Sequence, residues 1–201
     1  MSTINAAAVD LFMAKAKPAS VQVSEAQNLK EALNFALKVC ERKPLATLAP
    51  IGEVSPPAEG RKKTFAAPAL DDKAWGYLLE AGAKMDFKMI RQGLRNYLHG
   101  IDVAFSLADF GLADTASSVI ECENEDERLA SMICESHVIA LAKSKIFAQS
   151  YEAEGLLNAA LAKERNFTAF ISGPSRTADI ERVLTLGVHG PLELYLVLVE
   201  E

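Results

Sequence analysis

The chain has 201 residues, of which 50% are hydrophobic and 24% are charged, and its net charge is −6. This composition predicts one globular domain over residues 1–201, and the acidic balance argues against nucleic acid or anionic lipid as a partner, because both need a basic surface. No apolar run approaches the length of a membrane span, the start lacks a secretory pattern, and the three scattered cysteines predict neither a disulfide framework nor a metal site, so we expect a cytoplasmic protein.

The N-terminal segment, about residues 1–40, is expected to be mainly helical. Apolar residues recur at helical spacing over residues 1–17, and residues 21–23 suit a short strand. The spacing of Ser24 and Gln27 is typical of a capping box, which predicts a second helix that ends near Val39.

Residues 41–63 are expected to form an irregular, exposed loop, because prolines and glycines interrupt them repeatedly. A short strand near residues 45–48 is an alternative within this loop. The loop ends in the triplet Arg61-Lys62-Lys63, which we interpret as a solvated surface patch, with anion binding as the alternative.

From residue 64 onward, helical and strand patterns alternate. The expected helices cover residues 71–82, 89–100, 147–163 and 176–186, and the expected strands cover residues 85–88, 103–109, 116–122, 138–141, 167–171 and 192–199. This alternation predicts an α/β fold with a mostly parallel sheet flanked by helices. The runs FTAFI and LYLVLV are typical of strands covered on both faces. The short link inside residues 103–122 excludes a helical crossover and predicts a local antiparallel hairpin there.

The loop Gly173-Pro174-Ser175-Arg176-Thr177 follows an expected strand and is expected to open a helix. The first amides of a helix have no partner within it and carry partial positive charge. Gly173 permits a close backbone approach, Ser175 and Thr177 supply hydroxyls, and Arg176 supplies a planar cation. These groups together suit a carboxylate or a phosphate, and the alternative is an ordinary helix cap.

A second Gly-Pro pair follows at Gly190-Pro191, with His189 directly before it. Two Gly-Pro pairs this close together are either element boundaries or two loops held beside each other for a ligand. His189 precedes a strand, which favours a place at the edge opposite the Gly173 loop. A single loop histidine is more often structural than catalytic.

Four further candidates lie between these segments and the N-terminal part. Asp109 and Asp114 flank a glycine turn and are followed by Thr115. These side chains either bond to amides of the turn itself or face a ligand. His137 precedes an apolar strand and is either a buried, hydrogen-bonded histidine or a proton donor at a cleft. Asp114 and His137 are therefore the candidate catalytic residues.

Three stretches, in this order, resemble the lactate utilization protein C family, also called the LUD domain. The strongest is SGPSRTADIERVLTLGVHGPLELYLVLVE at residues 172–200. ADFGLADTASSV is similar to the family's Asp-Phe-Ala-Ile-Ala-Glu-Thr-Gly-Ser segment, and RLASMICESHVIAL is similar to its Arg-x-x-Ser-x-x-Pro-x-x-His-Ile segment. The resemblance covers roughly residues 90–201.

The resemblance implies the fold of the sugar-phosphate isomerases and CoA transferases, the NagB/RpiA type. It also implies a cytoplasmic role in L-lactate oxidation to pyruvate, beside two iron–sulfur partner proteins. The chain departs from the family at Asp114-Thr115-Ala116, where the family has Glu-Thr-Gly. The side chain of Asp114 is shorter than that of glutamate by about one methylene, and Ala116 lacks the conformational freedom of glycine. We therefore expect any chemistry on this loop to be altered or lost.

Three functions follow from these observations. The first is an accessory subunit of organic-acid oxidation that binds a small anion or an anionic cofactor, although no cofactor is evident in the chain. The second is an independent enzyme for a phosphorylated or CoA-linked small molecule, with Asp114 as nucleophile or base. The third is a non-catalytic docking protein for iron–sulfur redox partners.

Overall fold

The computed structural model describes residues 4–46, 60–97, 99–164, 167–177, 185–187 and 189–200. Its centre is a six-stranded sheet in the order β1-β12-β7-β4-β2-β3, in which every neighbouring pair is parallel. These strands are β1 (Val21–Ala26), β2 (Thr64–Ala66), β3 (Lys88–Ile90), β4 (Ile101–Leu107), β7 (Cys134–Ala142) and β12 (Glu193–Val199).

A second, four-stranded sheet has the order β8-β5-β6-β9. Its strands are β5 (Phe110–Leu112), β6 (Ser117–Cys122), β8 (Ile146–Phe147) and β9 (Phe167–Ile171). The strands β5 and β6 are antiparallel, which confirms the hairpin expected within residues 103–122. Two short strands, β10 (Arg176–Thr177) and β11 (Thr185–Leu186), form a separate antiparallel pair.

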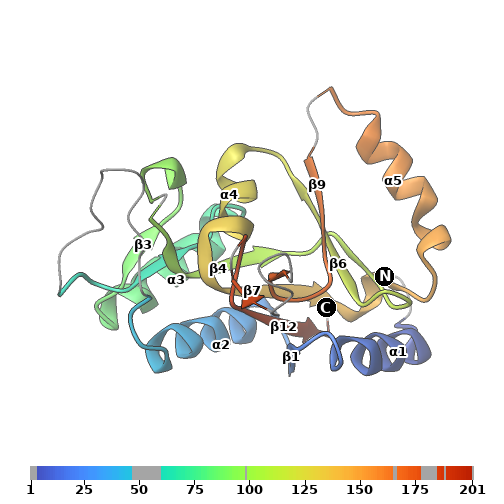
Figure 1. The fold of residues 1–201 in the computed structure, drawn as a ribbon, viewed down its shortest axis with the longest axis horizontal. Helices are drawn as coiled ribbons and strands as arrows, with labels where there is room; N and C mark the ends of the chain where they lie inside the picture. The colour runs from blue at the N-terminus through green and yellow to red at the C-terminus, as the bar shows by residue number, and fades with distance from the viewer. Residues whose placement is uncertain are drawn as a thin grey trace.

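The helices α1 to α4 pack on the two faces of the central sheet, and α5 packs against the second sheet. They are α1 (Ala6–Ala16), α2 (Leu29–Arg42), α3 (Asp72–Lys84), α4 (Glu125–Ile133) and α5 (Glu154–Leu161), with 3-10 helices η1 (Leu94–Tyr97), η2 (Lys143–Lys145) and η3 (Ser150–Ala153). One face packs against α2 and α3, and the other against α1 and the second sheet (Figure 1). The predicted α/β fold with a parallel sheet flanked by helices is confirmed.

Several predicted boundaries differ from the structure. Ser24 belongs to β1, and α2 begins after Asn28, whose side chain accepts the amide of Glu31. Because Asn28 caps the first turn of α2, Ser24 is not needed as the cap and β1 can continue through it. Residues 88–97 form β3 and η1 rather than a long helix, and the predicted strand at residues 45–48 falls partly in 47–59, outside the described residues.

The two apolar runs have different surroundings. β12 lies between β1 and β7 and is buried from Leu194 to Val199, as predicted. β9 is an edge strand with one neighbour, β6, among the described strands, so Phe167 and Phe170 are 42% and 52% exposed. The prediction that β9 is covered on both faces is therefore wrong.

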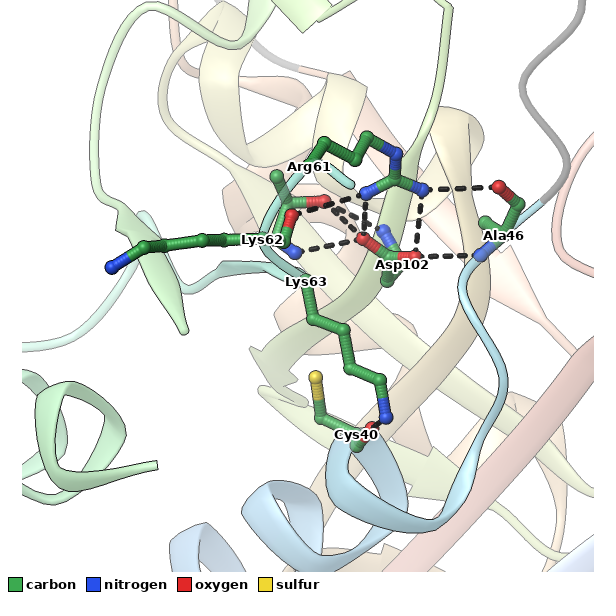
Figure 2. Close-up of polar contacts among 7 residues, drawn as sticks. Cys40, Ala46, Arg61, Lys62, Lys63 and Asp102 are labelled. Carbon is green, nitrogen blue, oxygen red and sulfur yellow. Dashed lines mark hydrogen bonds and ion pairs between the residues drawn. The ribbon is translucent and has the colours of Figure 1, made fainter. Parts of the chain in front are cut away.

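The basic triplet is not a shared surface patch. Arg61 points toward Asp102, Lys63 points toward the backbone of Cys40, and Lys62 points away from both (Figure 2). Lys62 pairs with the exposed Asp86, and Lys63 donates to the carbonyl oxygens at the end of α2. Because Arg61 and Lys62 are each paired with a carboxylate, the structure does not support anion binding by this triplet as a unit.

Candidate functional site

A cavity of about 530 Å³ lies at the amino ends of β7 and β12, beside β9. Successive residues of β9 form one side, the end of α4 forms another, and the two Gly-Pro loops close one end. The residues that line it are Ser131, Met132, His137, Phe167, Thr168, Ala169, Phe170, Ile171, Ser172, Gly173, Ser175, Arg176, His189, Gly190, Pro191 and Leu194.

The two Gly-Pro loops are held side by side by hydrogen bonds to Ser175. The Ser175 N–H donates to the Pro191 carbonyl oxygen at 2.8 Å, and the Gly187 N–H donates to the Ser175 carbonyl oxygen at 3.0 Å. The His189 N–H donates to Ser175 Oγ at 3.2 Å. His189 therefore lies beside the Gly173 loop, and its expected place at the opposite edge is wrong.

The helix expected to begin at Arg176 or Thr177 is absent at those residues, which form β10. The remainder of that prediction, residues 178–184, lies outside the described residues. The N–H and the carbonyl oxygen of Ser175 both bond to the loop of the second Gly-Pro pair, at Pro191 and Gly187. These two bonds hold the backbone at Ser175 extended. The mechanism of anion binding by unpaired helix amides is therefore wrong for this loop, as far as the structure describes it.

Arg176 and Gly173 anchor the first loop to the turn before β1. Arg176 Nη2 donates to the Ala19 carbonyl oxygen at 2.6 Å and also to Ser20 Oγ. A Cβ on Gly173 would lie 2.8 Å from the same carbonyl oxygen, so glycine is required for this close approach. Arg176 is exposed and lines the cavity, so its guanidinium contributes positive charge there while it holds the loop in place.

His137 is the most unusual side chain of the cavity. It is fully buried on β7, and its Nε2 lies 2.9 Å from Ser106 Oγ. No described residue bonds to its Nδ1. Burial lowers the pKa of His137 to about 4, so the ring is neutral at pH 7. A buried nitrogen without a hydrogen bond costs about 1–3 kcal/mol, which a ligand that bonds to Nδ1 would recover.

The lining of the cavity favours an anion. It contains four hydroxyl side chains, two histidines and one arginine, and no Asp or Glu from the described part of the chain. This is notable in a protein with a net charge of −6. A ligand carboxylate would meet hydrogen-bond donors and one cation there without a like charge beside it.

Asp114 lies outside the cavity. Its carboxylate accepts the Ser150 N–H at 3.0 Å and the Ser150 hydroxyl at 2.8 Å, at the start of η3. Desolvation would raise the pKa of Asp114, but the bonds from Ser150 outweigh it and lower the pKa. The structure therefore does not bring Asp114 and His137 together as a catalytic pair.

Other predicted site residues are also separate from the cavity. Asp109 accepts the Glu121 N–H at 2.7 Å, and neither Pro174 nor Thr177 belongs to the lining. Thr115 reaches the cavity indirectly, because its hydroxyl lies 2.8 Å from Ser117 Oγ, which lies 2.7 Å from the lining residue Ser172.

Sequence reasoning missed Ser106 and Ser172. Ser106 is a buried polar residue inside the apolar strand β4, and that break in an apolar run was a usable signal. Ser172 directly precedes the Gly-Pro pair and carried no signal of its own.

The three cysteines are not suited to act as nucleophiles. All are buried, and burial raises the pKa of Cys40 and Cys134 to about 12 and that of Cys122 to about 11. Within the described ranges, no group of three or more His, Cys, Asp or Glu side chains is placed to hold a metal ion. None of the helices described is long and apolar enough to cross a membrane.

Comparison with known proteins places this geometry in a family. The chain is 29% identical to lactate utilization protein C of Macrococcus caseolyticus over 103 residues, which are 50% of this chain and 45% of that protein. It is 31% identical to lactate utilization protein C 1 of Bacillus mycoides over 103 residues, 50% of this chain and 44% of that protein. The match thus spans less than half the length of these relatives.

A solved structure shares the fold. It is the crystal structure of a DUF162 family protein from Deinococcus radiodurans, with a TM-score of 0.63 and 15% sequence identity over 96% of this chain and 97% of that one. The family model of the LUD domain matches residues 9–199. With nearly its whole length matched, the chain belongs to the LUD domain family.

Proposed function

We propose that this chain binds a carboxylate-bearing organic acid, or an anionic cofactor, in the cavity beside His137. We further propose that it serves cytoplasmic L-lactate oxidation as an accessory subunit. The observation that carries the binding proposal is the cavity lining, which combines hydroxyls, two histidines and Arg176 and lacks a carboxylate from any described residue. The names of the relatives, lactate utilization protein C, support the link to lactate utilization.

The charged head of the ligand would lie at the end of the cavity where the two Gly-Pro loops meet. Arg176 supplies the positive charge, and its bonds to Ala19 and Ser20 hold the guanidinium before a ligand arrives. Such preorganisation reduces the entropy lost on binding. At the buried side, His137 Nδ1 would bond to an uncharged oxygen of the ligand, because the ring is neutral at pH 7.

The proposed partners are iron–sulfur subunits that carry the electrons of the oxidation. This part rests on the family resemblance.

We leave Asp109, Asp114 and Thr177 out of the proposed site because none of them lines the cavity. The proposed role is therefore to bind an acid, and no nucleophile is assigned.

Calorimetry on the purified chain with L-lactate, pyruvate and inorganic phosphate tests the binding proposal. We expect Arg176→Gln to weaken acid binding by tenfold or more, as the loss of a charged hydrogen bond at about 1.5–3 kcal/mol implies. Lys38→Gln is the matched control, because it removes the same charge from an exposed position on α2, which packs on the other face of the central sheet. If neither these three anions nor longer organic acids bind at millimolar concentration, the binding proposal is wrong.

Growth of a deletion strain on L-lactate tests the biological role. We expect the strain to lose growth on L-lactate but not on glucose, and to regain it with the wild-type gene. Unimpaired growth of the deletion strain on L-lactate would contradict the role even if the chain binds acids.

A further inference from the structure

The cavity has an apolar side that a three-carbon acid would leave uncovered. β9 pairs with β6 so that Phe167, Ala169 and Ile171 lie opposite Cys122, Ile120 and Ser118. Ile120, Cys122 and Ile171 pack into the core between the two sheets. Alternate residues of a strand share a face, so Phe167 and Ala169 also face the central sheet, and both line the cavity.

Large apolar side chains are exposed along this side. Phe167 is 42% exposed, and Met132 at the end of α4 is 48% exposed. The Arg128 guanidinium lies 5.3 Å from the centre of the Phe167 ring and holds the ring in this position. Single exposed apolar residues are common, but three that line one cavity, Phe167, Met132 and the 52% exposed Phe170, indicate a surface that a ligand covers.

Polar groups also line the cavity, and the one cation among its described lining residues, Arg176, comes from the first Gly-Pro loop. His137, Ser175 and Arg176 all belong to its lining. The cavity is therefore amphipathic, with a cation at the Gly-Pro loops and large apolar side chains along β9 and at the end of α4. Its volume of about 530 Å³ lies within the roughly 300–1,000 Å³ of pockets that hold drug-sized molecules.

We infer that the ligand is an amphipathic anion, a carboxylate on an apolar body longer than that of lactate, such as a medium-chain 2-hydroxy or 2-oxo acid. The carboxylate lies near Arg176, the 2-oxygen meets His137, and the alkyl body lies against Phe167 and Met132. This inference rests on the proposed function, because it needs an anion in the cavity, and it adds the class of ligand.

Calorimetry with a series of straight-chain 2-hydroxy acids, from lactate to 2-hydroxyoctanoate, tests the inference. Each added methylene should tighten binding by about fourfold until the apolar wall is covered, as burial of one CH₂ group predicts. Met132→Ala should reduce this gain. Leu156→Ala is the matched control, because Leu156 is 44% exposed on α5 and does not line the cavity.

The outcomes separate the two proposals. Equal affinity for short and long acids, with the dependence on Arg176 retained, would overturn the inference and leave the proposed function standing. A gain with length that Met132→Ala leaves unchanged would also overturn it, because the chain would then bind elsewhere. Absence of binding for every acid would remove the proposed function, and the inference with it.

Discussion

Two buried polar side chains in neighbouring strands have opposite surroundings. Asp102 on β4 accepts hydrogen bonds from the Ala46 N–H, from two guanidinium nitrogens of Arg61, and from the N–H and hydroxyl of Thr64 (Figure 2). His137 on β7 has one partner, Ser106, and its second nitrogen has none among the described residues. Both side chains are almost fully buried.

This difference separates a structural group from the group that we propose binds a ligand. Asp102 ties residues 46, 61 and 64 together and has no bonding capacity left for a ligand. Desolvation would raise the pKa of Asp102, but the bonds from Arg61, Ala46 and Thr64 outweigh it and lower the pKa. His137 keeps an unused nitrogen beside a cavity, and incompletely satisfied buried groups of this kind mark places where a ligand can bind.

The largest effect is expected from Asp102→Ala. The change leaves the Arg61 guanidinium largely buried without its counter-charge, because that side chain is only 13% exposed. Breaking a buried ion pair in this way costs about 3–5 kcal/mol of unfolding free energy. Urea unfolding measures the loss.

Glu80→Ala serves as its control, since Glu80 forms an exposed pair with Lys84 within α3. That variant should be indistinguishable from the wild type, because exposed pairs contribute little. If Asp102→Ala matched it, the view of Asp102 as a structural clamp would be wrong.

The next effect concerns pH and His137. The folded pKa of about 4 lies below the unfolded value of 6.5, so the unfolded chain binds a proton that the folded chain does not. The stabilisation is complete above pH 6.5 and is lost as the pH falls toward 4, by about 3 kcal/mol in total. Urea unfolding from pH 7 to pH 5 measures the slope.

His137→Gln removes the titrating group and should flatten this dependence between pH 7 and pH 5. Asp102 titrates below this window, because its pKa is lowered from 3.8. An unchanged slope in the variant would mean that another group controls acid stability and that His137 is not held neutral by burial.

The smallest effect on stability is expected at the turn that contains Asp114. Like Asp102, Asp114 already accepts hydrogen bonds within the protein, from Ser150. Ala116 has φ +51, a left-handed backbone that costs a non-glycine residue about 1–2 kcal/mol. Ala116→Gly removes this strain but loses one buried methyl group and adds unfolded-state entropy, so the three effects nearly cancel. We expect the unfolding free energy to change by less than about 0.5 kcal/mol.

Ala113→Gly is the matched control in the same turn. Ala113 is also buried but lacks a positive φ, so this variant should be less stable by about 1–2 kcal/mol. Equal losses in the two variants would mean that Ala116 stores no strain.

The candidate site was only partly predictable. The sequence singled out Gly173, Ser175, Arg176, His137 and His189, and the structure gathers all five around one cavity. It also singled out Asp109 and Asp114, whose carboxylates instead bond to backbone and hydroxyl groups nearby. A carboxylate beside a glycine turn has the same sequence pattern in either role, because the direction of its side chain depends on the tertiary contacts.

Similar apolar runs also had different outcomes. FTAFI and LYLVLV both predicted strands, and both are strands. Only the second is buried, because it lies between β1 and β7 in the central sheet, whereas β9 has one neighbour among the described strands. That residues 1–201 form a single domain stays a prediction.

The alternation of helical and strand patterns by itself determined that the chain forms an α/β fold, because the spacing of apolar residues is a local property of the sequence. The tertiary structure alone decided which strand lies at an edge, which loops meet at Ser175, and which buried group lacks a partner. Those outcomes depend on contacts between residues far apart in sequence, such as Arg61 with Asp102 and Ser106 with His137, and no local pattern encodes them.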